Sequence, residues 1–321
     1  MREDVFRLNN LKDNPNYIFD SGIFRQKSVY TQAQEQTGKC FGFKWEKRNT
    51  YESNAMESAS KKWLLERYAL SDISLDDLIR GKTVLDAGCG SGYSASLLFD
   101  KLLNYCDYLG VDISNAVDVA KERFTERGLR GSFLQANILD LPEEIDNFDI
   151  IFSEGVLHHT DSTEQAIKYL STRLASGGYF MFYVYNKKAP IREFSDDYVR
   201  ERIALLTDEE AWKALEPLTK LGILLGELNL ELDIKEPIDI LDIPAGRINL
   251  QRFFYWYIFK AYYRPEFSLE EMNHINFDWY RPINCHRQTP QQVMDWVEYC
   301  GLDLLKIDIQ EAGITVIAKK K

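Results

Sequence analysis

The sequence predicts an α/β fold built on a mostly parallel sheet, and three observations lead to this class. Short β-type runs alternate with helical stretches between residues 80 and 186. Polar or acidic side chains stand directly after four of these runs. The first run leads through a glycine-rich turn into a helix. Because open parallel sheets bind ligands at the carboxyl ends of their strands, the pattern also predicts one crevice along that edge.

The glycine-rich turn lies within residues 83–93, which read TVLDAGCGSGY. The β-type run ends at Asp86, and Gly88, Gly90 and Gly92 follow at alternate positions. Glycines let main-chain N–H groups approach a ligand, and the next helix points its N-terminus at the same ligand. An ordinary tight turn gives a similar pattern, so the interpretation depends on the strands that follow.

Three further strands are expected to end in polar side chains at the same edge of the sheet. They lie at 108–113, 132–136 and 148–152. Asp112 ends the first of them, roughly 20 residues past the glycine turn, the spacing at which an acid reaches a ribose hydroxyl. Asn137 follows the second and Glu154 the third. The four strand ends together indicate a nucleotide-type ligand.

Five motifs in this order resemble those of class I S-adenosylmethionine (SAM) dependent methyltransferases, and most closely the methyltransferase type 11 subgroup typified by ubiquinone and menaquinone C-methyltransferases. They are VLDAGCGSG, GVDIS, QANILDLP, FDIIFSEGVLHH and Ser176-Gly177-Gly178. The resemblance covers about residues 80–186 and the C-terminal strands. It implies SAM as cofactor and a Rossmann-like, seven-stranded, mostly parallel sheet that ends in an antiparallel hairpin. It does not specify the methyl acceptor.

The resemblance also implies which residues hold SAM. Asp86 would orient the ammonium group, Asp112 would accept hydrogen bonds from both ribose hydroxyls, and Ile113 would pack on adenine. Asn137 stands where many relatives carry Asp, and its amide can accept from the adenine amino group or donate. The full set is Asp86, Gly88, Cys89, Gly90, Gly92, Asp112, Ile113, Asn137, Ile138, Glu154 and Gly155.

His158 and His159 are the candidates for a general base, because a neutral imidazole titrates in the useful range. Methyl transfer from SAM is an in-line displacement, for which the protein mostly supplies positioning. A base is needed only where the acceptor atom carries a proton at neutral pH. The alternative is that the pair only shapes the pocket.

Acceptor contacts are expected from the cluster at residues 276–287 and from strand five. Tyr280, Arg281 and His286 are the candidates in the cluster, and Tyr185 is the candidate on the strand. An arginine there can hold a carboxylate or phosphate with two hydrogen bonds. The alternative is a loop that fastens a cap to the core. The histidines match no standard zinc spacing, so no metal site is expected.

The predicted elements divide the chain into four parts. These are an N-terminal extension with helices at 1–79, the SAM-binding core at 80–186, a largely helical, aromatic-rich cap at 187–284 on the acceptor side, and a C-terminal helix with two strands at 285–321. Residues 1–50 are polar and irregular, and their aromatic cluster at 41–45 is either a lid over the cofactor or packing on the sheet edge.

Helix and strand signals place the remaining elements. Helices are expected at 54–68, 71–79, 94–103, 116–127 and 161–174, and from Pro290 to Cys300; strands at 179–185, 302–309 and 313–318. Asp161, Ser195, Thr207, Ser268 and Thr289 are the expected helix caps, four of them with Glu or Gln three residues later.

Composition limits the partners. The net charge of −11 disfavours a phosphate backbone, so nucleic acid is an unlikely partner. Five cysteines without a CxxC pair and a charged start at residues 1–4 predict a cytoplasmic protein, and no apolar run approaches the ~18–20 residues of a membrane span. The aromatic run at 253–263 motivates a homodimer hypothesis.

The expected function is methyl transfer from SAM to a small-molecule, lipid or saccharide acceptor held between core and cap. A macromolecular acceptor, protein or tRNA, and a non-catalytic SAM-binding subunit are the alternatives. A nicotinamide-dependent oxidoreductase would carry G-x-G-x-x-G, whereas the glycines here alternate.

Overall fold

The computed structural model of the protein describes residues 6, 8–27, 30–143, 145 and 147–321. The charged start at residues 1–4, on which the expectation of a cytoplasmic protein partly rests, lies outside them. None of the helices in this described part combines the length and the apolar character that crossing a membrane requires.

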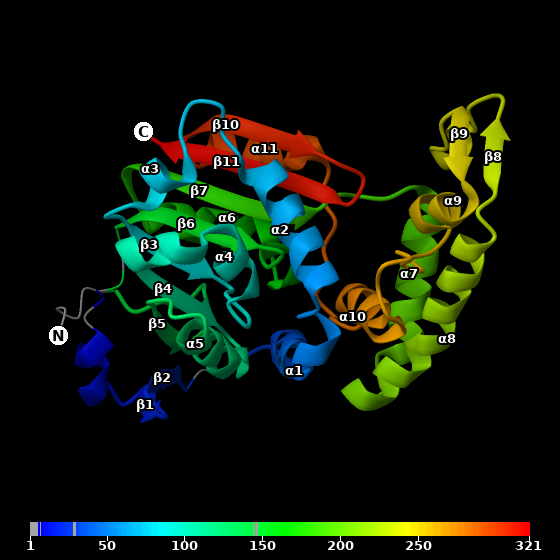
Figure 1. The fold of residues 1–321 in the computed structure, drawn as a ribbon. Helices are drawn as coiled ribbons and strands as arrows, with labels where there is room; N and C mark the ends of the chain where they lie inside the picture. The colour runs from blue at the N-terminus through cyan, green and yellow to red at the C-terminus, as the bar shows by residue number, and fades with distance from the viewer. Residues whose placement is uncertain (1–5, 7, 28–29, 144, 146) are drawn as a thin grey trace.

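Within the described residues, nine strands form one large sheet (Figure 1). In spatial order they are β1 (Tyr17–Asp20), β2 (Ile23–Gln26), β5 (Ser132–Gln135), β4 (Asp107–Asp112), β3 (Thr83–Ala87), β6 (Phe148–Glu154), β7 (Leu174–Tyr185), β11 (Gly313–Lys320) and β10 (Leu302–Ile309). The central strands are parallel, whereas β11 runs antiparallel to β7 and to β10. The predicted mostly parallel sheet with a final antiparallel hairpin is confirmed.

The N-terminal region is more regular than the sequence predicts. The hairpin β1–β2 extends the predicted seven-stranded sheet at the edge of β5, with Phe24 paired in register with Leu134. Residues Gln32–Glu46 form helix α1, which begins where the Thr31 hydroxyl accepts a hydrogen bond from the Gln34 N–H at 3.1 Å. The expectation of an irregular segment was therefore wrong for this stretch.

Helices cover both faces of the sheet, because successive strand residues point to opposite sides. In β3, Leu85 packs in the cluster that includes Ile167 and Val293 of helices α6 and α11, whereas Val84 packs in the cluster that includes Leu64 of α2. The helices of the core are α2 (Asn54–Tyr68), α3 (Leu75–Ile79), α4 (Tyr93–Leu98), α5 (Ala116–Glu126), α6 (Thr163–Thr172) and α11 (Pro290–Tyr299).

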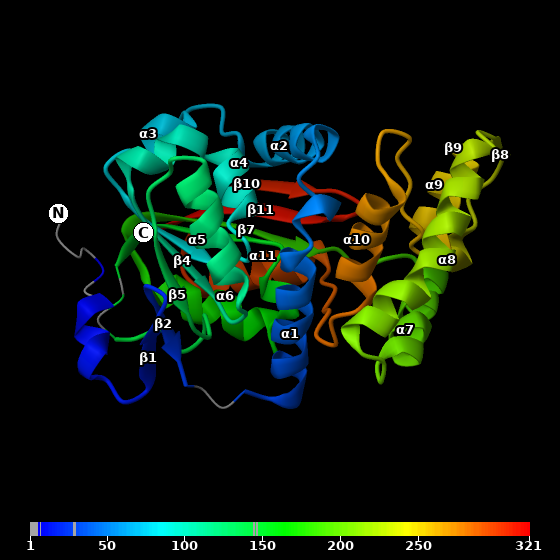
Figure 2. The same ribbon diagram turned by 60° about the horizontal axis from the view of Figure 1, so that its bottom comes forward.

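The segment at 187–284 lies beyond the carboxyl ends of the strands, with α7, α8 and α9 farthest from the sheet and α10 beside it (Figures 1 and 2). Its elements are α7 (Pro190–Ile203), α8 (Asp208–Glu227), β8 (Glu231–Ile234), β9 (Gly246–Asn249), α9 (Leu250–Tyr257) and α10 (Leu269–Tyr280). We call it the cap. The capping boxes at Thr207, Ser268 and Thr289 are confirmed.

Two predicted caps were wrong. Ser195 lies inside α7, because that helix already begins at Pro190, whose fixed φ suits the first helical position. The cap of α6 is Ser162, whose hydroxyl accepts from the Gln165 N–H at 3.3 Å. The carboxylate of the neighbouring Asp161 instead accepts a hydrogen bond from the Asn284 side chain at 2.8 Å.

Candidate functional site

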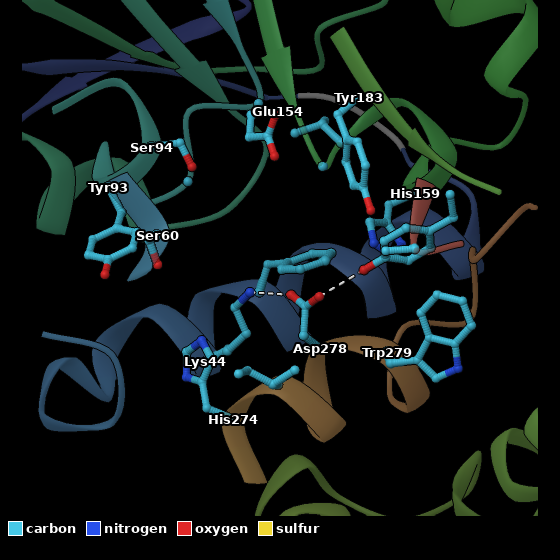
Figure 3. A pocket seen from close by; sticks show the side chains of 18 of the residues that line it. Lys44, Ser60, Tyr93, Ser94, Glu154, His159, Tyr183, His274, Asp278 and Trp279 are labelled. Carbon is cyan, nitrogen blue, oxygen red and sulfur yellow. Dashed lines mark hydrogen bonds and ion pairs between the residues drawn. The ribbon is translucent and has the colours of Figure 1, made fainter. Parts of the chain in front are cut away.

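A cavity of about 510 Å³ lies at the carboxyl ends of β3, β4, β6 and β7, between the core, helices α1 and α2, and the cap. All the predicted cofactor residues except Gly92 line it. The polar strand ends that the sequence places at one edge therefore do share one chamber. Figure 3 shows part of its wall, with Glu154, Tyr183 and His159 on one side and Lys44 and Asp278 opposite.

The glycine turn is closely packed as well as open to the cavity. Gly90 has φ +50°, and a Cβ at this position would lie 2.7 Å from Nε1 of Trp45 on α1. Gly92, with φ +67°, begins α4 and faces Ala120 and Phe124 of α5 instead of the cavity. Gly92 is thus needed for the turn, and its predicted place in the cofactor wall is corrected.

Asp112 is held by the turn that it faces. Its Oδ2 accepts a hydrogen bond from the Gly90 N–H at 2.8 Å, and Oδ1 accepts from the Ser114 N–H and hydroxyl at 2.9 and 2.6 Å. Burial raises the pKa of the carboxyl, and the hydrogen bonds from Ser114 and Gly90 oppose that rise. The acid on β4 and the glycine turn after β3 are therefore one connected unit.

Asp86 lies one residue before the end of β3, lines the same cavity and is buried. Its Oδ2 accepts a hydrogen bond from the Tyr108 hydroxyl at 2.6 Å. Burial raises the pKa of Asp86 to about 7, the Tyr108 hydrogen bond lowers it, and the charges of Asp112 and Glu154 raise it further. A positively charged ligand group beside Asp86 would favour the ionised carboxylate.

Asn137 and Glu154 complete the strand ends. The Asn137 Oδ1 accepts from the Leu139 N–H at 2.9 Å, so this amide shapes its own turn as well as facing the cavity. Glu154 accepts from Arg67 Nη2 and from the Tyr68 hydroxyl, each at 2.5 Å. The sequence analysis missed Arg67, whose only signal was a basic residue within an otherwise apolar helix face.

The two adjacent histidines differ in position. His159 lines the cavity, and its Nδ1 lies 2.6 Å from the main-chain oxygen of Asn284. His158 does not line the cavity; its ring packs, tilted by 33°, against Tyr185 with centroids 3.7 Å apart. Burial lowers the pKa of both rings, to about 4 for His159. Within the part of the chain that the structure describes, His159 Nε2 is buried without a hydrogen-bond partner.

A charged group that the sequence analysis missed lies opposite the histidine. The Lys44 ammonium on α1 pairs with Oδ1 of Asp278 on α10, and the Tyr185 hydroxyl donates to Oδ2 at 2.9 Å (Figure 3). Burial disfavours the charged carboxylate, but Lys44 holds the pKa of Asp278 well below its usual range. The aromatic cluster at 41–45 thus lies over the cavity, since Phe41, Lys44 and Trp45 all line it.

Three of the four predicted acceptor contacts do not line the cavity. The Tyr280 hydroxyl donates to Asp196 at 2.8 Å, Arg281 forms an ion pair with Asp208 at 2.7 Å, and His286 Nε2 lies 3.0 Å from the Thr160 oxygen. The first two contacts lie within the cap, and the third joins the segment after the cap to the core. Tyr185 alone of the four lines the cavity.

The cap end of the cavity is lined by residues that the sequence analysis did not name individually as acceptor contacts. Aromatic and basic side chains share this wall: Tyr255, Trp256, Tyr262, Phe267, Trp279, Lys188, Arg192, Arg252, Lys260 and Arg264. Among the described residues, no group of three or more His, Cys, Asp or Glu side chains is arranged to hold a metal ion.

Comparison with known proteins identifies the core. Residues 78–220 match a family model described as a methyltransferase domain. The chain is 32% identical over 152 residues to the probable tRNA methyltransferase 9B of Mus musculus, which covers 46% of this chain and 31% of that protein. It is 30% identical over 126 residues to the ubiquinone biosynthesis O-methyltransferase of Coxiella burnetii, which covers 39% of this chain and 52% of that protein.

One solved structure found by comparison is magnesium protoporphyrin IX methyltransferase from Synechocystis PCC 6803 with bound SAH. It aligns with a TM-score of 0.48 at 12% identity, over 90% of this chain and 100% of that one.

The chain spans less than a third of the probable tRNA methyltransferase 9B and about half of the ubiquinone relative. Residues 78–220 therefore form a methyltransferase domain, of the class I SAM-dependent type that the motifs predicted. SAM is the cofactor of this class of enzyme.

Proposed function

We propose that the protein transfers a methyl group from SAM to a small-molecule, lipid or saccharide acceptor held between the core and the cap. The observation that supports this most directly is the single cavity of about 510 Å³ that joins the strand ends to the aromatic wall of the cap. A chamber of this size, closed by two parts of the chain, suits a small ligand group better than a folded macromolecule.

The residues around the glycine turn suit SAM. Asp86 faces the cavity where a ligand ammonium group would favour its ionised form, and Asp112 offers carboxylate oxygens for ribose hydroxyls. Gly88 and Gly90 leave the wall free of side chains beneath the ligand. SAM supplies an electrophilic methyl group, so the protein has mainly to position the acceptor.

His159, the histidine of the pair that lines the cavity, is the candidate for removing a proton from the acceptor. A carbonyl oxygen can only accept, so the hydrogen bond to Asn284 places the hydrogen on Nδ1. The other nitrogen, Nε2, is then the one with a lone pair in the neutral ring, and it is buried without a partner among the described residues. Because burial lowers the pKa of His159 to about 4, the ring is neutral at pH 7.

A labelling experiment tests this function. Calorimetry with S-adenosylhomocysteine measures cofactor binding, and SAM with a radiolabelled methyl group measures transfer to the components of a cell extract. We expect label in the small-molecule or lipid fraction. Label only in tRNA or protein would favour the macromolecular alternative, and binding without transfer would favour a non-catalytic subunit.

Location and assembly belong to the same proposal. The five cysteines are free thiols, which supports a reducing, cytoplasmic environment. The aromatic run at 253–263 motivated a homodimer, but Tyr255, Trp256 and Tyr262 of that run line the cavity. These side chains can therefore contact the acceptor within a single chain, without a dimer. Light scattering would measure whether a dimer forms.

A further inference from the structure

Three cationic side chains gather around one indole at the cap end of the cavity. The Lys260 ammonium lies 4.9 Å from the ring centroid of Trp279, the Arg192 guanidinium 5.2 Å and the Lys188 ammonium 5.4 Å. All four residues line the cavity. A fourth cation near the same ring, Arg200, does not line the cavity and forms an ion pair with an aspartate.

One buried carboxylate lies among these cations, and its hydrogen-bonding capacity is already used. Oδ2 of Asp196 accepts from Arg192 Nε at 2.6 Å and from Trp279 Nε1 at 2.7 Å. Oδ1 accepts from the Tyr280 hydroxyl at 2.8 Å and from the main-chain N–H of Lys260 at 3.3 Å. Asp196 therefore balances the charge of Arg192 and leaves both lysines without a carboxylate of their own.

The two lysine ammonium groups make no ion pair in the part of the chain that the structure describes. Lys188 Nζ donates to the carbonyl oxygens of Asn186 and Ala312 at 2.8 and 2.9 Å, and also to that of Glu311. No acceptor lies within hydrogen-bond distance of Lys260 Nζ among the described residues, although Lys260 is only 6% exposed. Burying a cation without an anionic partner raises the free energy of the folded protein.

The pKa values of both lysines agree with this shortage of negative charge. Burial and the nearby charges of Arg192 and Lys260 lower the pKa of Lys188 to about 7, although the charges of Glu193 and Asp196 oppose the fall. Burial lowers the pKa of Lys260 to about 7, although the charge of Asp278 opposes the fall. An anion beside them would raise both pKa values and hold the ammonium groups charged.

The rest of this wall suits the body of an organic ligand. Arg252, whose Nη2 donates to the Tyr263 carbonyl at 3.3 Å, adds a guanidinium 5.5 Å from the ring centroid of Tyr255. Aromatic rings such as Tyr255 and Trp256 line the same cavity and offer apolar surface. Apolar walls with a few converging charged groups are typical of small-molecule sites.

We propose that Lys260, Lys188 and Arg192 form a subsite for an oxyanion group, carboxylate or phosphate, on the methyl acceptor. The inference rests on the proposed function, because it assigns this end of the shared cavity to the acceptor. It narrows the acceptor from any small molecule to one that carries such an acidic group. An arginine and lysines within one pocket are the usual partners of both oxyanions.

Binding of small aromatic probes tests the subsite without knowledge of the acceptor. Benzoate, phenyl phosphate and the neutral benzamide would be titrated by calorimetry into the full chain, with and without S-adenosylhomocysteine. We expect at least one anion to bind about tenfold or more tightly than benzamide, the scale of a hydrogen bond to a charged group. The stronger of the two anions identifies the acidic group that the subsite prefers.

Variants locate the binding. Lys260→Met should remove most of the preference for the anion, and Lys260→Arg should keep it. Lys187→Met is the matched control, because Lys187 is exposed and does not line the cavity. Affinity for S-adenosylhomocysteine should stay the same in all three. Should Lys260→Met fold poorly by thermal melting, Lys188→Met would replace it, because Lys188 belongs to the same subsite.

Two results would overturn the subsite: equal affinities for benzamide and both anions, or an anion preference that Lys260→Met or its replacement leaves unchanged. Failure of the proposed function is a separate result. In that case the wild-type protein would not bind S-adenosylhomocysteine, while the titrations in its absence would still report on the anion.

Discussion

Arg67 Nη2 lies 2.5 Å from Oε1 of Glu154, in an ion pair whose side chains are 1% and 7% exposed. The pair joins helix α2 to the end of β6, and Arg67 Nη1 also donates to the Thr315 hydroxyl of β11 at 3.2 Å. The other carboxylate oxygen of Glu154 accepts from the Tyr68 hydroxyl. The cavity wall at β6 is therefore held in place by a helix that precedes the methyltransferase domain.

Arg67→Met should lower the free energy of unfolding by about 3–5 kcal/mol, because it leaves the Glu154 carboxylate buried without its cation. Urea denaturation followed by circular dichroism would measure the change. Arg80→Met is the control, since the Arg80–Asp76 pair is exposed and solvent screens such pairs. A loss for Arg67→Met no larger than that of the control would contradict the prediction.

Asp112→Ala should weaken binding of S-adenosylhomocysteine by roughly tenfold or more, the scale of a lost hydrogen bond to a charged group. The structure adds a second reason, because Asp112 also accepts the Gly90 N–H and so holds the glycine turn. Calorimetry would measure the affinity. Asp118→Ala serves as a control because Asp118 does not line the cavity. An unchanged affinity of Asp112→Ala would refute the ribose assignment.

The sequence was sufficient for the core because its signals are local. The strands around Asp86 and Asp112, the glycine turn and three capping boxes each depend on a few neighbouring residues. Parallel strands bring their carboxyl ends to one edge of the sheet. The residues that line the cofactor side of the cavity could therefore be predicted from the order of the strands.

Helix α1 and the acceptor wall could not be predicted in the same way. The residues that α1 buries are small or polar, among them Gly38, Cys40, Gly42 and Lys44, so no apolar period marks it. Asp278 meets Lys44 across 234 positions of sequence. The cluster at residues 276–287 lies near the cavity in the sequence pattern, but its Tyr280 points into the cap interior toward Asp196.

Binding of S-adenosylhomocysteine should become tighter as the pH rises from 6 to 7.5. Burial raises the pKa of Asp86 to about 7, so below that pH the carboxyl is protonated and must release its proton to pair with the ligand ammonium group. Calorimetry across this range would show the trend, with at most about a tenfold change per pH unit. Asp86→Asn should remove the slope, and so should 5′-methylthioadenosine, which lacks the amino acid part. The same slope in Asp86→Asn would assign it to another group.

His159→Ala should slow single-turnover methyl transfer by about 10²–10⁴-fold, the usual contribution of a positioned base. The measurement uses the acceptor from the extract experiment, provided that its reacting atom carries a proton. His158→Ala should change the rate only a few-fold, because His158 does not line the cavity. It should chiefly lower stability through lost packing on Tyr185.

Burial lowers the pKa of His159 to about 4. Protonation of His159 should therefore slow the wild-type enzyme only as the pH drops below about 5. Equal rates for both variants and the wild type would leave the histidine pair as pocket wall alone.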